Sequence, residues 1–279
     1  MDVAWEDFGW ERLGNGIGRR RLPGWDATAG LVAGPDGALL YDTGATLREG
    51  VELRRQAEAL LGRRVTHIAL SHPHFDHVLG TAAFAGAQVY GAVGVAALLR
   101  GGAESLCASA VRHGVLDGEA ARSADTLVVP HHEVCGDWTL DLGGGRQVLL
   151  ANVGPGHSGH DLAALVPGTG GEPPVVFCGD LVEESGEPQA GRDAIVSRWP
   201  AALERLLALG GEDALYVPGH GAVVDAAFVR AQRASLAERF DVDLDARPGV
   251  GPGVGPGLDL DVGPGGDLDV DVNAGLDVG

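Results

Sequence analysis

The amino-acid sequence predicts a layered α/β sandwich, in which strands first pair locally and then alternate with helices. Short apolar runs at 65–70 and 175–178 have the composition of buried strands. Residues 47–61 instead repeat apolar side chains at helical spacing and are followed by a glycine, as at the end of a helix. Consecutive glycines at 143–145 separate two further apolar runs, which is the pattern of a hairpin.

The other expected elements rest on the same criteria. Strands are predicted at 38–41, 65–70, 138–142, 146–153, 162–166, 175–178 and 215–217. Helices are predicted at 47–61, 92–100, 103–112, 199–209 and 225–240. Pro200 is tolerated in a first helical turn, where its missing N–H has no partner to lose, and Asp225 is a suitable N-cap.

Composition narrows the classes of partner. The chain has 279 residues, a net charge of −19 and 45% hydrophobic residues, and its only strongly basic residue is arginine. An acidic surface repels phosphate backbones, so nucleic acid is not an expected partner. Apolar runs fall short of the ~20 residues that span a bilayer, the first residues do not resemble a secretory signal, and three cysteines are too few for a disulfide framework. We therefore expect a cytoplasmic protein with a small-molecule substrate and no membrane partner; the sequence leaves its oligomeric state open.

The composition changes at residue 241. Residues 241–279 consist of Gly-Pro repeats and Asp-Leu or Asp-Val alternation, which gives little apolar surface and much mutual repulsion. Calcium-binding β-helical repeats also combine Gly and Asp, but their regular nonapeptide is missing here. The prediction is one folded domain over 1–240 followed by a disordered, low-complexity tail over 241–279.

The segment that follows the strand at 65–70 is the richest in chemistry. It places His72, His74, Asp76 and His77 within six residues. Neutral imidazoles and carboxylates are the ligands that zinc and similar ions prefer. In an irregular loop, His72 and His74 can point one way while Asp76 and His77 point another, which would serve two adjacent ions.

Three further polar residues also follow apolar strands. His157, Asp180 and His220 each come directly after such a run and beside glycines, which allow the backbone to turn sharply. Each of these short motifs is weak by itself. Together they place potential ligands at the same edge of one stack of sheets.

The order His-x-His-x-Asp-His, Gly-His-Ser, Cys-Gly-Asp and Pro-Gly-His-Gly resembles the metallo-β-lactamase-fold metallo-hydrolase superfamily, over roughly 29–221. The resemblance implies an αββα four-layer sandwich with metals in a cleft at one edge. It also implies one ion held by His72, His74 and His157, a second held by Asp76, His77 and His220, and Asp180 bridging the two. Asp42 matches the acidic residue that ends an early strand of the family. An aspartate at position 180, where the best-known class B β-lactamases use a cysteine, favours the glyoxalase II-like dinuclear branch.

The resemblance implies a function as well. Two zinc ions, with iron or manganese as alternatives, would generate a bridging hydroxide that cleaves an ester, thioester, lactone or lactam. Asp76 would be the catalytic residue that orients the nucleophile and accepts its proton. His160 is predicted as a substrate-binding residue, with a structural role equally compatible with its position. The alternative is a mononuclear iron enzyme similar to sulfur dioxygenases, which would use His72, His157 and Asp180 alone.

The last predicted helix bears on the substrate. Glyoxalase II-like enzymes that take glutathione thioesters hold the peptide carboxylates with a basic, aromatic C-terminal helical region. The helix at 225–240 offers Arg230, Arg233 and Arg239 but no lysine or tyrosine. We expect these arginines to lie on a solvated helix face, which weakens the glutathione hypothesis.

Overall fold

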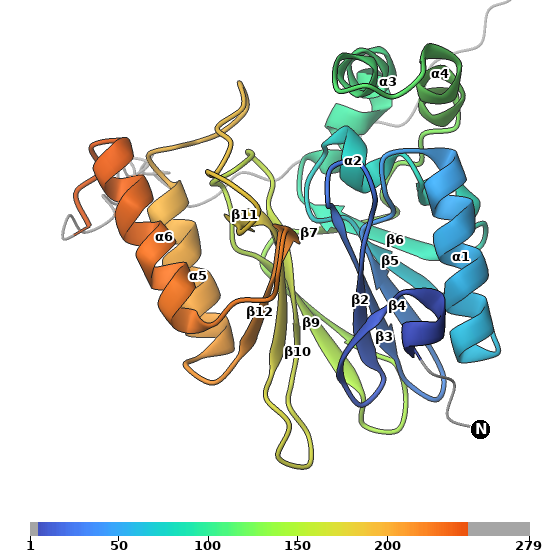
Figure 1. Cartoon of the computed structure of the whole chain (residues 1–279), viewed down its shortest axis with the longest axis horizontal. Helices are drawn as coiled ribbons and strands as arrows, with labels where there is room; N and C mark the ends of the chain where they lie inside the picture. The colour runs from blue at the N-terminus through green and yellow to red at the C-terminus, as the bar shows by residue number, and fades with distance from the viewer. Residues whose placement is uncertain (1–4, 245–279) are drawn as a thin grey trace, which may run out of the picture. The chain divides into compact units, whose positions relative to one another are not determined.

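The computed structural model describes residues 5–244. Two β-sheets pack face to face, and helices cover the outer face of each sheet (Figure 1). From one side to the other, the layers are the α5/α6 pair, the five-stranded sheet, the seven-stranded sheet and the helices around α1. This is the four-layer αββα sandwich expected from the sequence.

The two sheets differ in the direction of their strands. The first sheet has the order β1(Glu11–Gly14), β2(Ile17–Arg21), β3(Thr28–Ala33), β4(Ala38–Tyr41), β5(His67–Ala69), β6(Gln88–Ala92) and β7(His132–Val134). Its strands are antiparallel up to β4 and parallel from β4 to β7. The second sheet contains β8(Asp137–Asp141), β9(Gln147–Asn152), β10(Leu162–Val166), β11(Val175–Glu183) and β12(Leu215–His220), and only β11 and β12 are parallel.

Side chains that accept hydrogen bonds cap the first turns of two of the helices. The helices are α1(Leu47–Leu61), α2(Phe75–Val78), α3(Val95–Arg112), α4(Asp117–Asp125), α5(Trp199–Gly210) and α6(Ala226–Arg239), with 3₁₀ turns η1(Trp5–Phe8) and η2(Thr81–Ala83). The Thr46 side chain accepts a hydrogen bond from the Glu49 N–H at the start of α1. Asp225 caps α6 in the same way, as its position in the sequence predicts.

The interface between the sheets is apolar and closely packed. The rings of Tyr41 in β4 and Phe177 in β11 stack at 5.4 Å, and the Tyr41 hydroxyl donates to the Leu162 carbonyl oxygen across the interface at 2.7 Å. A Cβ atom at Gly30 would collide with the Phe177 ring, so that position requires glycine. These contacts fix the two sheets against each other and thereby the strand ends that carry the candidate ligands.

The structure differs from the sequence-based prediction in several elements. The helices expected at 92–100 and 103–112 are one continuous helix, α3, and Ala92 belongs to β6. The loop expected at 71–77 ends in the short helix α2. Strands β1, β2, β3, β6 and β7 and helix α4 were not predicted.

The described residues extend slightly past the predicted domain boundary. Asp241 has φ 53°, and the Val242 N–H donates to the Ala237 carbonyl oxygen at 2.9 Å, a geometry that closes α6. The tail predicted from 241 onward lies, from residue 245, outside the described residues. Within residues 5–244, the helices are all too short or too polar to cross a membrane.

Candidate metal centre

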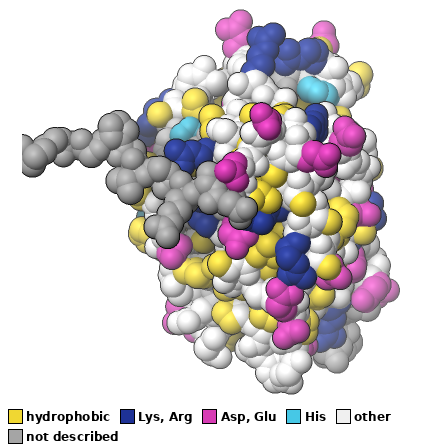
Figure 2. Space-filling view, turned by 90° about the vertical axis from the view of Figure 1, so that its left-hand side faces the viewer, with side chains coloured by type: hydrophobic (Ala, Val, Ile, Leu, Met, Phe, Trp, Pro, Cys, Tyr) yellow, Lys and Arg dark blue, Asp and Glu magenta, His cyan; other side chains and the backbone are white. Residues whose placement is uncertain are grey.

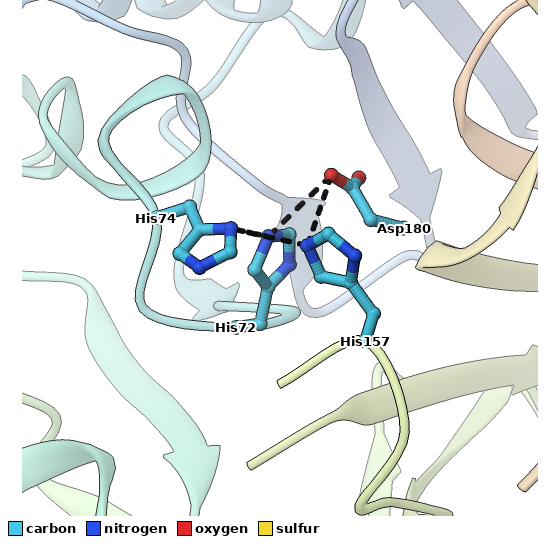
Figure 3. A group of neighbouring side chains, drawn as sticks. All are labelled: His72, His74, His157 and Asp180. Atoms are coloured by element: carbon cyan, nitrogen blue, oxygen red, sulfur yellow. Dashed lines mark hydrogen bonds and ion pairs between the residues drawn. The ribbon is translucent and has the colours of Figure 1, made fainter. Parts of the chain in front are cut away.

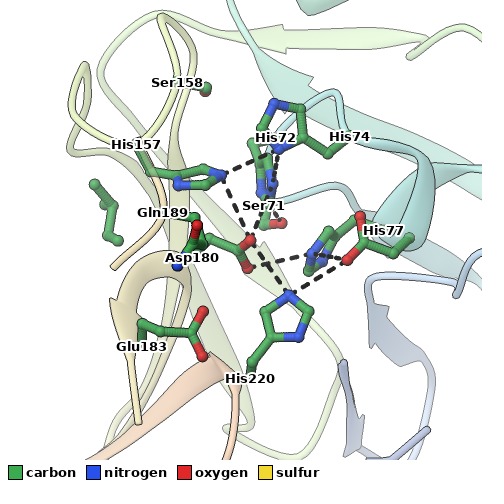
Figure 4. Close-up of polar contacts among 12 residues, drawn as sticks. Ser71, His72, His74, His77, His157, Ser158, Asp180, Glu183, Gln189 and His220 are labelled. Carbon is green, nitrogen blue, oxygen red and sulfur yellow. Dashed lines mark hydrogen bonds and ion pairs between the residues drawn. The ribbon is translucent and has the colours of Figure 1, made fainter. Parts of the chain in front are cut away.

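The seven predicted metal ligands lie together at one edge of the sandwich. His72 and His74 follow β5, and Asp76 and His77 belong to α2. From the second sheet come His157, which follows β9, Asp180 within β11, and His220 at the end of β12. Strand ends from both sheets therefore meet at one cluster, as the order of motifs predicts (Figure 4).

The first group consists of three imidazoles and one carboxylate (Figure 3). His74 Nδ1 lies 3.0 Å from His72 Nε2 and 3.1 Å from His157 Nε2. Asp180 Oδ2 lies 3.6 Å from His72 Nε2 and 3.4 Å from His157 Nε2. Four ligands at zinc-like bond lengths around one tetrahedral point would be about 3.3 Å apart. The four distances given above lie within about 0.3 Å of that value.

The second group contains two imidazoles and shares Asp180. Asp76 Oδ2 lies 3.3 Å from His220 Nε2 and 3.5 Å from His77 Nε2. Asp180 turns Oδ1 toward His77 Nε2 at 3.2 Å, while its Oδ2 is 3.3 Å from His220 Nε2. One carboxylate thus contacts both groups.

Buried polar atoms of the cluster lack a hydrogen bond, which indicates that the cluster binds a cation. Among the residues described, His77 Nε2 and Asp180 Oδ1 are buried and form no hydrogen bond, although the two atoms lie 3.2 Å apart. Buried polar atoms in native proteins are nearly always paired, because an unpaired one retains its desolvation cost. A divalent cation would satisfy both atoms, so the residues present fit a metal pair.

Two of the imidazoles are oriented by uncharged groups. The Ser71 hydroxyl lies 2.8 Å from His72 Nδ1 (Figure 4). His220 donates from Nδ1 to the Trp25 carbonyl oxygen at 2.7 Å. In both histidines this contact engages Nδ1 and leaves Nε2 facing the cluster.

Two other imidazoles are oriented by carboxylates. His77 Nδ1 donates to Asp42 Oδ2 at 2.8 Å, and Asp42 Oδ1 also accepts from the Ser71 backbone N–H. His74 is turned the other way, with Nε2 2.9 Å from Asp193 Oδ2 and Nδ1 facing the cluster. Carboxylate partners fix the ring and raise its basicity as a ligand. Asp42 was matched to the family by position, whereas Asp193 was not predicted.

Burial and neighbouring charge act in opposite directions on the imidazoles of the cluster, and in His74 the contact with Asp193 outweighs burial and raises the pKa. Burial lowers the pKa of His72, and it lowers the pKa of His157 to about 4. Burial also acts to lower the pKa of His77 and His220, but nearby carboxylates, Asp180 foremost, outweigh it. The pKa of His77 is raised well above its usual value, and that of His220 is raised to about 11.

A cavity of about 760 Å³ opens over the cluster. One wall is the face of α3, and the opposite wall is the segment 183–193, which follows β11. His113 also lines this cavity, with its ring stacked on Phe75 at 5.2 Å, and so does Glu183, whose pKa is raised by burial. The sequence analysis identified neither residue with the site.

His160 lies beside the site and does not line this cavity. Its Nδ1 donates to the Val93 carbonyl oxygen at 2.7 Å, just before α3. Cys178 is buried at 1% exposure, and burial raises the pKa of its thiol. The structure thus places Cys178 in the core, as expected of a small apolar residue.

The three arginines of α6 are occupied elsewhere. Arg230 pairs with Glu212 at 2.6 Å, Arg233 pairs with Glu204 at 3.0 Å, and Arg239 donates to a backbone carbonyl. Basic and acidic side chains intermingle on this side of the molecule (Figure 2). None of the three lines the cavity over the cluster, so a glutathione-type contact from this helix has no support.

Comparison with known proteins defines the class. Residues 22–220 match the family model of the metallo-beta-lactamase superfamily. The match covers well over half of the chain, and the chain belongs to this superfamily. It is therefore a metal-dependent hydrolase, and the His/Asp cluster is the feature that fits the metal dependence.

Individual relatives are distant. The chain is 27% identical over 198 residues to metallo-beta-lactamase domain-containing protein 1 of Xenopus laevis, covering 70% of this chain and 71% of that protein. A metallo-beta-lactamase from Pontibacter korlensis aligns with a TM-score of 0.63 at 22% identity, covering 81% of this chain and 97% of that one. The metallo-beta-lactamase FIM-1 from Pseudomonas aeruginosa, in a mono-zinc form, aligns at 0.62 and 19% identity, covering 84% and 96%. These structures share the fold.

Proposed function

We propose that this chain is a dinuclear zinc hydrolase of the glyoxalase II-like branch that cleaves an ester, thioester, lactone or lactam. The observation that carries the proposal is the position of Asp180, whose Oδ1 and Oδ2 contact both ligand groups. A carboxylate in that position can join two cations a few ångströms apart. A cysteine in that position would offer a single sulfur atom in place of two oxygens.

Bound zinc would supply positive charge that lowers the pKa of a water molecule from 15.7 to about 7 and polarises the substrate carbonyl. We assign to Asp76 the role of accepting the proton of that water. Its contacts with His77 and His220 both use Oδ2, and Asp76 lines the cavity. Oδ1 is then available to orient the water and accept its proton.

A small-molecule substrate is consistent with the space available. The cavity of about 760 Å³ falls within the roughly 300–1,000 Å³ typical of small-ligand sites. It is also lined by candidate ligands from both groups, such as His157 and His220. A substrate in the cavity would therefore lie against residues of both ligand groups.

The test is metal analysis combined with a hydrolysis panel of thioesters, esters, lactones and β-lactams. Zinc-loaded protein is expected to hold two zinc ions per chain and to cleave at least one class. Reaction in ¹⁸O-labelled water separates the hydrolase from the iron alternative, because a hydrolase places the labelled oxygen in the acid product. One iron per chain with uptake of molecular oxygen would replace this proposal by the oxygenase.

A matched pair of variants ties the activity to the cluster. His157→Gln removes a proposed ligand and is expected to abolish turnover and lower the zinc content. His132→Gln changes a histidine in β7 that is not part of the cluster. Its ring stacks on the Tyr90 ring, with the ring centroids 4.6 Å apart. This variant is expected to leave both quantities unchanged.

A further inference from the structure

Two adjacent glycines occupy the middle of α3, where helices seldom tolerate them. Gly101 and Gly102 lie well inside Val95–Arg112, and a glycine in a helix interior is destabilising relative to alanine. Packing does not require either residue. Neither has a left-handed backbone, and a Cβ atom added to either would meet no other atom within 4 Å.

The two glycines differ in what they face. Gly102 lines the cavity over the metal cluster, whereas Gly101 is exposed and does not. Leu98 and Leu106, one turn before and one turn after Gly102 on the same helical face, also line the cavity. The missing side chain therefore leaves a notch between two leucines.

The side chains around the notch are apolar, and part of their surface is exposed to solvent. Leu98 is 48% exposed although it belongs to the cavity wall, while Leu106 is 8% exposed. Trp25 and Phe75 line the same cavity, with their rings edge to face at 5.3 Å. A site of this size and lining is larger than a two-carbon acyl group fills, and contact with a longer apolar group would remove the exposed leucine surface from water.

We infer that Gly102 is a specificity-determining residue and that the notch receives the apolar part of an acyl substrate, of the size of a medium alkyl chain or an aryl ring. The inference rests on the hydrolase function proposed above. It adds the substrate class: esters or thioesters of bulky apolar acids in preference to acetyl or other short acyl compounds. Absence of a Cβ at 102 sets the width available to that group.

The test compares 4-nitrophenyl acetate with 4-nitrophenyl octanoate in the zinc-loaded protein. The wild type is expected to favour the octanoate ester in kcat/KM. Gly102→Leu fills the notch and is expected to lower kcat/KM for the octanoate ester by about 10-fold or more, the scale on which pockets discriminate hydrocarbon groups, with little change for the acetate ester. Gly101→Leu, the matched control on the exposed side of the same helix, is expected to change neither.

Binding is measured separately by calorimetry with octanoate and acetate on zinc-loaded protein. Octanoate is expected to bind more tightly than acetate to the wild type and to Gly101→Leu, and to lose that advantage in Gly102→Leu. The inference would be overturned if Gly102→Leu lowered kcat/KM equally for both esters, or if it left octanoate affinity unchanged. If no ester is cleaved while octanoate binding still depends on Gly102, the notch stands and the hydrolase proposal fails.

Discussion

The two ligand groups share Asp180 but are built in different ways. In the first, burial keeps the pKa of His72 and His157 below the usual value, so both imidazoles are neutral at pH 7 and ready to donate to a metal. Burial also acts to lower the pKa of the third imidazole, His74, but the contact with Asp193 outweighs it and the pKa is raised. In the second, carboxylates raise the pKa of His77 and His220, so without metal these imidazoles carry protons. A metal entering the second group must displace protons from both of its imidazoles, against one of three in the first group, so its affinity there should depend more strongly on pH.

The partners that orient the rings also differ. Asp42, which holds His77, is 1% exposed and belongs to the interior. Asp193, which holds His74, has a side chain that is 49% exposed and lies on the segment before α5. The second group is thus fixed by the core, and the first is fixed in part by the surface. Variants in the two groups should therefore differ in their effects.

Asp180→Asn is expected to give the largest effect, because it alters both groups at once. An amide offers one acceptor oxygen where the carboxylate turned Oδ1 and Oδ2 toward different histidines. We expect zinc content well below two per chain and a fall in kcat beyond the roughly 10⁴-fold upper range for one proton-transfer residue. Elemental analysis and the hydrolysis assay measure both quantities. Two tightly bound zinc ions in this variant would contradict the bridging role.

Asp76→Asn is expected to impair only the second group. The amide cannot accept a proton and is a weaker ligand, so kcat should fall by about 10²–10⁴-fold. KM should change less, because the cavity walls remain. His160→Ala is the control: since His160 does not line the cavity, its loss should cost about 10-fold or less. Near-normal kcat for Asp76→Asn with both metals bound would remove Asp76 from the mechanism and favour the mononuclear hypothesis.

Asp42→Asn tests orientation from the interior. The asparagine keeps an oxygen for the Ser71 N–H but presents an amide donor to His77 Nδ1. The imidazole must then carry its proton on Nε2, which faces the cluster. Zinc affinity of the second group should fall by about 10–100-fold, as measured by competition with a fluorescent chelator. Unchanged affinity would mean that Asp42 contributes only to packing.

The pH dependence of stability should separate metal-free from zinc-loaded protein. The pKa of His220 is raised to about 11 in the folded chain, against about 6.5 when unfolded. Its contribution is fully present below pH 6.5 and declines as pH rises toward 11. Chelated protein should therefore lose Tm between pH 6.5 and 9, while zinc-loaded protein, in which the metal replaces the proton, should lose less. Parallel Tm curves in circular dichroism would refute this account.

The candidate ligands could be predicted because their signal is local. His72 and His74 follow an apolar strand within four residues, and Asp180 and His220 stand beside glycines at strand ends. A short stretch of sequence thus contains both the strand and the ligand. Asp193 has no such signal, because its contact with His74 joins residues 119 apart in the chain, and an aspartate in a polar loop resembles any other.

Elements that tertiary contacts decide were predicted less well. Gly101 and Gly102 suggested a break between two helices, yet α3 is continuous because Leu99 and Ala110 on either side of them are buried in the core, and packing outweighs propensity. Strand β2 was missed because its Arg19–Arg21 run looks solvated. Arg19 is in fact 2% exposed. It forms an ion pair with Glu11 and donates a hydrogen bond to the Gly221 carbonyl oxygen, next to His220.

Asp193→Ala is expected to give the smallest effect, and it is the sharpest test of the comparison. The variant removes the carboxylate that holds His74, but that carboxylate is half exposed, and water can replace it as an acceptor for the Nε2 proton. We expect zinc affinity of the first group to fall by less than about 10-fold, the lower end for such partners, with no change in Tm. Competition with the same chelator compares it directly with Asp42→Asn. If the two variants lose equal affinity, burial of the orienting carboxylate does not set its contribution, and the distinction between a group fixed by the core and one fixed at the surface fails.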